Sequence, residues 1–166
     1  MADFTPEQKL IFTARLCSYC GAVPELRSAR EVFGDKAEGS GRFYVCPGCG
    51  ARVGCHRFSE QAMGRVASAE LRRLRGIAHK VFDTVWRDGH KRSRYNAYSW
   101  LALRLDIPRH LVHMGYFDEK ECRRVIAVCA RFLTARDARR YASFLPYCSY
   151  DAGPDVESAH EQDNEG

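Results

Sequence analysis

The chain has 166 residues, 45% of them hydrophobic, and a formal net charge of +5 at pH 7. This length and apolar fraction are typical of one globular domain or two small ones. The acidic N-terminus does not resemble a signal peptide, and no stretch is apolar enough over its length to cross a bilayer. These features exclude a membrane partner, so we expect a soluble protein of the cytoplasm.

The chain begins with a short segment that favours a helix. Pro6 stands directly after Thr5, and proline is favourable at the first position of a helix. We predict one to three helical turns, in an N-terminal unit of residues 1–16.

Two Cys-x-x-Cys pairs follow, Cys17 with Cys20 and Cys46 with Cys49, each followed directly by glycine. Two residues between the cysteines close a turn that aims both sulfurs at one point, and the glycine can leave the turn with unusual backbone angles. Four thiolates on two such knuckles indicate one structural zinc ion, Zn2+, bound tetrahedrally. The alternative is two disulfides or free buried thiols. Cysteines arranged for zinc suit a reducing compartment.

The arm between the two knuckles is 25 residues long and rich in glycine. It reads as a loop around at most one short strand at 26–33. Residues 42–45 and 51–54 flank the second knuckle and are suited to a β-hairpin through 46–50. We therefore predict a zinc-ribbon-like module over residues 17–64.

The remaining cysteines have no knuckle spacing. Cys55 and His56 could replace one of the four thiolates or bind a second metal, because both are good zinc ligands. The alternative is a packed Cys55 beside a hydrogen-bonding His56. Cys122 and Cys129 lie at helical spacing and are predicted to belong to the core.

From residue 57 onward the pattern is helical. Ser68, Ser93, Asp118 and Thr134 each stand where a helix cap is expected. Apolar residues recur at three- and four-residue spacing after each cap. The predicted helices cover about 69–86, 94–105, 119–132 and 135–145. The fold class is thus α+β, a small zinc-ribbon-like β module followed by a three- to four-helix bundle over residues 65–147.

The last segment, residues 148–166, is predicted to be an acidic disordered tail. Residues 151–166 hold six acidic residues and no Lys or Arg, so that residues 1–150 carry a charge of +11. A basic body suggests an anionic partner, for which the tail would compete; the alternative is that the tail only aids solubility.

Several motifs in this order resemble one family, the zinc-finger-containing domain family found largely in phages and prophages. They are the two knuckles with Val53-Gly54-Cys55-His56, then Ala69-Glu70-Leu71-Arg72-Arg73, Ala78-His79, Phe82-Asp83, Trp86, Arg94, Ala97-Tyr98, Trp100-Leu101-Ala102, His113, Gly115, Phe117-Asp118 and Cys122-Arg123-Arg124-Val125. The resemblance spans roughly residues 15 to 130. It implies a metal-bound fold and a phage or prophage origin, hence the cytoplasm of a bacterial host, and it gives weak support for a nucleic-acid partner. Related sequences have cysteine where Val112 stands, which argues against a second metal site around His113.

Nucleic-acid binding, with DNA favoured over RNA, is the first functional hypothesis. Residues 65–109 hold eleven Lys and Arg against four acidic residues. The densest run, 90–95, lies where a loop enters a helix, and both its charges and free helix N–H groups attract phosphate. The predicted contacts are Arg72, Lys91, Arg92, Arg94 and, for base stacking, Tyr95. The alternative is a solvated basic face.

Two other hypotheses remain open. The first is a zinc-stabilised interaction module that docks on a host protein such as the transcription machinery, with Phe43 and Tyr44 facing the partner. The second is an enzyme built on His79 and Asp83 with His110 or His113, for which the support is weakest because a four-thiolate site has no open coordination position. We therefore predict no catalytic residues and find no sequence sign of a small-molecule substrate site.

Overall fold

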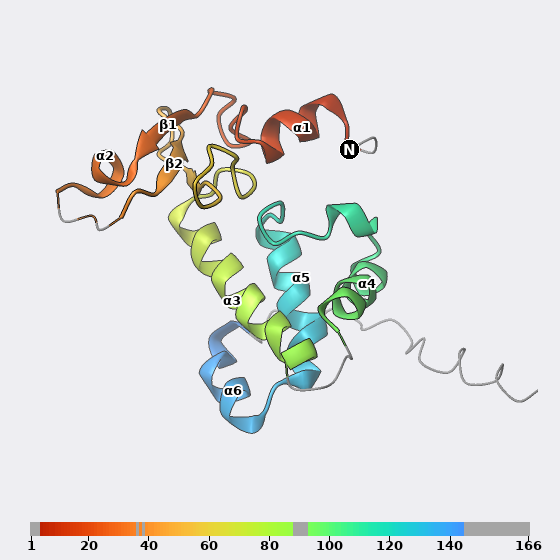
Figure 1. Cartoon of the computed structure of the whole chain (residues 1–166). Helices are drawn as coiled ribbons and strands as arrows, with labels where there is room; N and C mark the ends of the chain where they lie inside the picture. Colours follow the sequence, from red (N-terminus) through yellow and green to blue (C-terminus); the bar gives the residue numbers. More distant parts are fainter. Residues whose placement is uncertain (1–3, 36, 38, 88–92, 145–166) are drawn as a thin grey trace, which may run out of the picture.

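The computed structural model describes residues 4–35, 37, 39–87 and 93–144. A short helix opens the described chain, a three-stranded antiparallel sheet follows it, and a group of helices comes last (Figure 1). This confirms the predicted α+β class. Within the described residues, none of the helices combines the length and the apolarity that a membrane span needs.

The zinc module, residues 17–64, is built on strands β1 (Glu25–Ser28), β2 (Arg42–Val45) and β3 (Arg52–Gly54) in that spatial order. The predicted hairpin through the second knuckle is confirmed, because β2 and β3 pair on either side of it. Tyr44 and Val53 are partners in the register and share one face. Both are buried in a small core with the first cysteine of each knuckle.

The arm between the knuckles differs from the prediction in its second half. The strand ends at Ser28, and helix α2 (Ala29–Phe33) follows it. The Ser28 hydroxyl accepts a hydrogen bond from the N–H of Glu31, while the Glu31 carboxylate accepts one from the N–H of Ser28. This reciprocal capping box starts a helix within the segment 26–33, where at most one short strand was predicted.

In the described part of the chain, four α-helices follow the sheet: α3 (Ala69–Arg87), α4 (Arg94–Leu105), α5 (Glu119–Cys129) and α6 (Ala135–Arg140). All four predicted caps accept a hydrogen bond from the N–H three residues on. The apolar stripes pack α3 against α5 and α4, with large side chains such as Phe82 and Phe117 fully buried. Short 3₁₀ turns lie at η1 (Arg109–Leu111), η2 (Ala130–Phe132) and η3 (Ala142–Phe144).

The third helix ends as α-helix at Cys129, before the predicted Phe132, because the chain tightens into η2. The last helix is also shorter than predicted. It ends at Arg140, and η3 follows it. The predicted end near 145 and the acidic tail, residues 148–166, lie outside the described residues.

The zinc module and the helices are joined at a close backbone contact. Gly64 lies against Gly115, where the N–H of Arg65 donates to the Gly115 carbonyl at 3.0 Å. A Cβ on Gly64 would meet the Gly115 oxygen at 2.2 Å, so only glycine fits this approach. Beside it the half-buried Arg75 guanidinium donates to the carbonyls of Phe117 and Arg65. The contact fixes the angle between the two parts.

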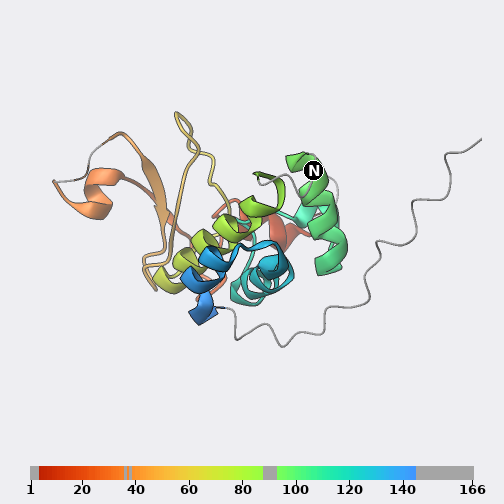
Figure 2. The same cartoon turned by 90° about the horizontal axis from the view of Figure 1, so that it is seen from below.

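Helix α1 (Pro6–Phe12) packs beside the connection between α4 and α5. Phe12 stacks on Tyr116 with ring centroids 4.3 Å apart, and Phe4 lies edge-on to both Tyr116 and His110. Turned by 90°, the molecule shows α2 and the sheet projecting to one side of the helices (Figure 2).

Candidate metal centre and basic cleft

The two knuckles have the same backbone geometry. In the first, the N–H of Gly21 donates to the Cys17 carbonyl at 2.9 Å, and Gly21 has φ +72°. In the second, the N–H of Gly50 donates to the Cys46 carbonyl at 2.9 Å, and φ is +71°. Glycine adopts this left-handed conformation without steric cost, which explains its place after each Cys-x-x-Cys pair.

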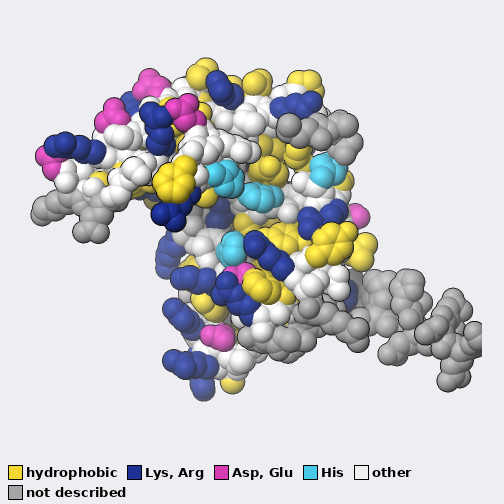
Figure 3. All heavy atoms as spheres, viewed as in Figure 1, with side chains coloured by type: hydrophobic (Ala, Val, Ile, Leu, Met, Phe, Trp, Pro, Cys, Tyr) yellow, Lys and Arg dark blue, Asp and Glu magenta, His cyan; other side chains and the backbone are white. Residues whose placement is uncertain are grey.

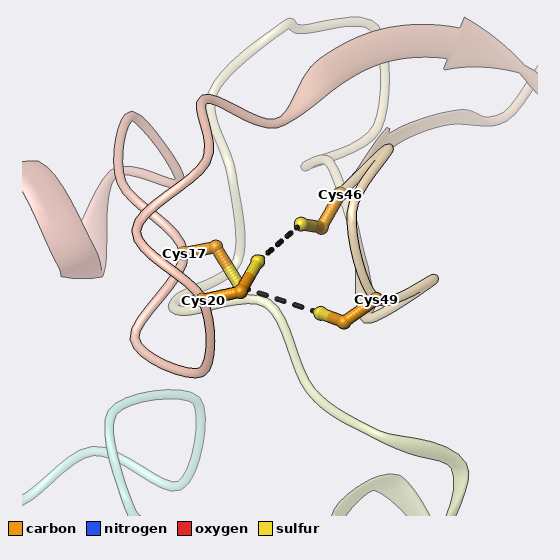
Figure 4. A group of neighbouring side chains, drawn as sticks. All are labelled: Cys17, Cys20, Cys46 and Cys49. Atoms are coloured by element: carbon orange, nitrogen blue, oxygen red, sulfur yellow. Dashed lines mark hydrogen bonds between the residues drawn. The ribbon is translucent and has the colours of Figure 1, made fainter.

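The four thiols converge on one point between the knuckles (Figure 4). The sulfurs of Cys17 and Cys49 lie 3.6 Å apart, those of Cys20 and Cys46 lie 3.4 Å apart, and all four are within 4.8 Å of one another. A zinc ion with Zn–S bonds of about 2.3 Å has sulfurs about 3.8 Å apart at the corners of its tetrahedron. The arrangement therefore fits one structural zinc ion.

The polypeptide favours the thiolate form at one of these sulfurs. The backbone N–H of Ala51 and that of Ala22 act to lower the pKa of Cys49 and of Cys20, but burial and the neighbouring thiols outweigh them and raise the pKa of Cys49 to about 12 and also that of Cys20. Although burial opposes the change, the Cys49 N–H and the neighbouring thiols lower the pKa of Cys46 to about 7. Zinc binds the deprotonated form, so such hydrogen bonds favour the metal. The closed set of four thiolates leaves no position for substrate, so the metal's contribution is structural.

The other thiols have different surroundings. Cys55 donates to the Glu60 carbonyl at 3.6 Å, and His56 lines a separate cleft, so neither joins the four-thiol group. Among the described residues, that group is the one cluster of Cys, His or acidic side chains placed to hold a metal. Cys122 and Cys129 are fully buried among the helices, which confirms the prediction for both.

A cleft of about 590 Å³ lies where β3 and the loop after it face α3 and α4. Figure 3 shows Lys, Arg and His side chains gathered around this hollow. Its lining includes five Lys or Arg and three His, and none of its described lining residues is acidic. The cationic residues are Arg52, Arg72, Arg75, Lys80 and Arg94, and the histidines are His56, His79 and His113.

The described part of the chain offsets little of the positive charge in this cleft: Asp83 lies 3.3 Å from His79 but forms no ion pair with the five Lys and Arg. Elsewhere five arginines form ion pairs with carboxylates: Arg27, Arg30, Arg42, Arg87 and Arg123. Within the described part of the chain, none of the five Lys or Arg of the cleft does so. Burial lowers the pKa of Arg75 to about 10, which still leaves it charged at neutral pH. Burial, and then Arg52, lower the pKa of Arg72. A cleft with such a charge attracts anions.

Two histidines of the cleft have defined hydrogen bonds. His79 Nδ1 lies 3.3 Å from the carboxylate of Asp83, which also accepts from Arg87 and Trp86. His113 Nδ1 accepts a hydrogen bond from the N–H of Gly115 at 3.2 Å. Burial and the surrounding cationic side chains lower the pKa of His113, so it is neutral at pH 7. Its proton therefore lies on Nε2, which can donate a hydrogen bond to a ligand.

The predicted phosphate contacts lie partly in this cleft. Arg72 and Arg94 both line it, from α3 and from the first residue of α4. Arg72 also donates to the Ala67 carbonyl at 2.6 Å. Tyr95 is 71% exposed, with Arg109 over its ring at 5.7 Å. Lys91 and Arg92 lie outside the described residues.

Sequence reasoning missed the cleft itself, although half of it could be found in the sequence. Arg72, Arg75, Gly76, His79 and Lys80 recur at three- and four-residue spacing and so share one face of α3. That face lies beside the apolar stripe, and its one acidic residue within α3 is Asp83, whose carboxylate lies 3.3 Å from His79. The other half comes from residues 52–56, 63 and 113–115, which approach α3 only in the folded chain.

Of the two aromatic residues predicted to face a host protein, one is buried. Tyr44 is only 9% exposed, because it packs in the core of the zinc module. Phe43 is half-buried and lies edge-on to Phe33 with ring centroids 5.1 Å apart. The prediction is therefore wrong for Tyr44, whereas Phe43 keeps part of its surface exposed.

The four-thiol site on two knuckles defines a zinc-finger protein. Residues 13–132 match the zinc-finger-containing domain family, and the chain belongs to this family. The match covers both knuckles, the cleft and helices α3 to α5. Neither the curated proteins nor the solved structures include a match to this chain.

Proposed function

We propose that this zinc-finger protein binds nucleic acid, DNA in preference to RNA, through the basic cleft and the adjoining face of α3 and α4. One observation carries the proposal: among the residues that the structure describes, the five Lys and Arg of the cleft have no carboxylate partner, although other arginines do. Phosphates would supply the missing negative charge. The phage or prophage origin, and with it a bacterial cytoplasm, belongs to the same proposal.

In this proposal the zinc ion helps to hold one wall of the cleft in position. It holds the knuckles together, the knuckles carry β3, and β3 forms one wall of the cleft. Lys91 and Arg92 would add phosphate contacts, and Tyr95 would stack on a base. Arg94 would bind at the junction, where free N–H groups of the helix N-terminus add to its charge.

The test is the binding of a labelled DNA oligonucleotide to the zinc-loaded protein at several salt concentrations. The double variant K80E/R94E reverses two exposed charges of the cleft. We expect a loss of affinity, and the slope of log affinity against log salt should fall by about 2, because two phosphate contacts are lost.

The matched control is R136E/R139E on α6, which changes the net charge equally but away from the cleft. It should retain most of the affinity. Equal losses of affinity in both double variants would show that only net charge matters, and the cleft would be rejected as the binding site. If the intact protein bound no nucleic acid, the function to test next would be docking on a host protein.

A further inference from the structure

Gly76 is placed in the middle of α3, where glycine weakens a helix relative to alanine. Packing does not require it, because a Cβ at this position would meet nothing within 4 Å. Gly76 lines the basic cleft, with Arg72 one turn before it and Lys80 one turn after it. A glycine there lets a ligand approach the helix backbone between two cationic side chains.

The cleft is not lined by charge alone. Met63, Met114, Val53 and Tyr98 give it an apolar part next to the cationic residues. A phosphate group alone would gain no binding energy from contact with this apolar surface. Methionine side chains are flexible and polarisable and pack well against aromatic rings. The lining therefore suits a ligand that joins an anionic group to a flat aromatic one.

The size of the cleft limits that ligand further. A volume of about 590 Å³ is within the range of pockets for small organic molecules. One nucleotide fits within this volume and combines a phosphate with an aromatic base. A base inside a duplex is stacked and paired, so only a single strand or an extruded nucleotide could place its base against the methionines.

We propose that the cleft receives one nucleotide unit of single-stranded nucleic acid. The phosphate lies over Gly76, between Arg72 and Lys80, and the base packs against Met63 and Met114. The Nε2–H of His113 donates to the base or the sugar. This inference rests on the proposed function and assigns the part of the nucleic acid that enters the cleft.

Competition experiments test the assignment. A labelled single-stranded oligodeoxynucleotide is bound to the zinc-loaded protein at constant ionic strength, and dAMP, deoxyadenosine and deoxyribose 5-phosphate are added separately. We expect dAMP to displace the oligonucleotide best, by about fivefold or more over the sugar phosphate, because base packing contributes to binding. The duplex of the same sequence should bind more weakly than the single strand.

The variant Gly76→Ala gives a second and independent readout. It should raise the melting temperature, because alanine favours the helix, and lower the affinity for dAMP, because the new methyl group occupies the site of close approach. The matched control is Ser99→Ala on α4, a residue that does not line the cleft. This variant tests whether a change of helix propensity alone alters dAMP binding. We expect its affinity for dAMP to equal that of the unaltered protein.

Each outcome decides the inference. Equal competition by dAMP and the sugar phosphate would reject the base contact, and unchanged dAMP affinity in G76A would reject the approach at Gly76. Oligonucleotide binding without competition by dAMP would overturn the inference and leave the proposed function standing. A protein that bound neither would contradict both.

Discussion

Replacing Cys46 with serine is expected to abolish zinc binding and to unfold the zinc module. Cys46 is buried, and its sulfur lies 3.4 Å from that of Cys20 within the four-thiol group. A structural zinc ion of this kind contributes roughly 10 kcal/mol or more to the folding of its module. Metal content measured after exchange into zinc-free buffer, together with thermal unfolding, checks this expectation.

The matched control for this prediction is Cys55→Ser. Cys55 follows the second knuckle closely, but its thiol donates to the Glu60 carbonyl and is not one of the converging sulfurs. This variant should keep its zinc and most of its stability. Loss of zinc from C55S, or its retention in C46S, would show that the four ligands are assigned wrongly.

Gly115→Ala should destabilise the protein by about 3 kcal/mol or more, because the two backbones at the junction cannot separate without losing their contact. A Cβ at Gly115 would lie 2.0 Å from the Met63 carbonyl oxygen, far inside van der Waals distance. The midpoint of urea unfolding measures the effect.

The same substitution at Gly76 provides the comparison, because there a Cβ meets open space. It should stabilise the protein by about 0.5–1 kcal/mol. If G115A unfolded at the same urea concentration as the unaltered protein, the two parts of the chain would not be held together by this contact.

Local chemistry explains which parts of the fold could be predicted. Each knuckle is closed by hydrogen bonds within six residues, from Cys17 to Ala22 and from Cys46 to Ala51, so its geometry is determined by nearby sequence. The helix caps at Ser93 and Asp118 are local in the same way. The zinc site and the starts of the helices could therefore be predicted from sequence patterns.

Helix α2 is an exception, because the Ser28–Glu31 capping box that starts it after four strand residues is local and could have been recognised at 26–33, where at most one short strand was predicted. Features that depend on contacts between distant segments could not be predicted from the sequence. The contact of Gly64 with Gly115 joins residues about fifty positions apart, and nothing near either glycine indicates its partner. The cleft depends on this contact, so only one wall, the cationic face of α3, could have been found in advance.

The most direct test of the cleft is a nuclear magnetic resonance titration of the zinc-loaded protein with a single-stranded oligonucleotide. Side-chain signals of His56, His79, His113 and Arg94 report on the cleft, and those of Arg136 and Arg139 report on α6. We expect the first group to shift in proportion to the bound fraction while the second stays nearly constant. Shifts centred on α6, or a saturated complex with unchanged histidine signals, would contradict nucleic-acid binding in the basic cleft.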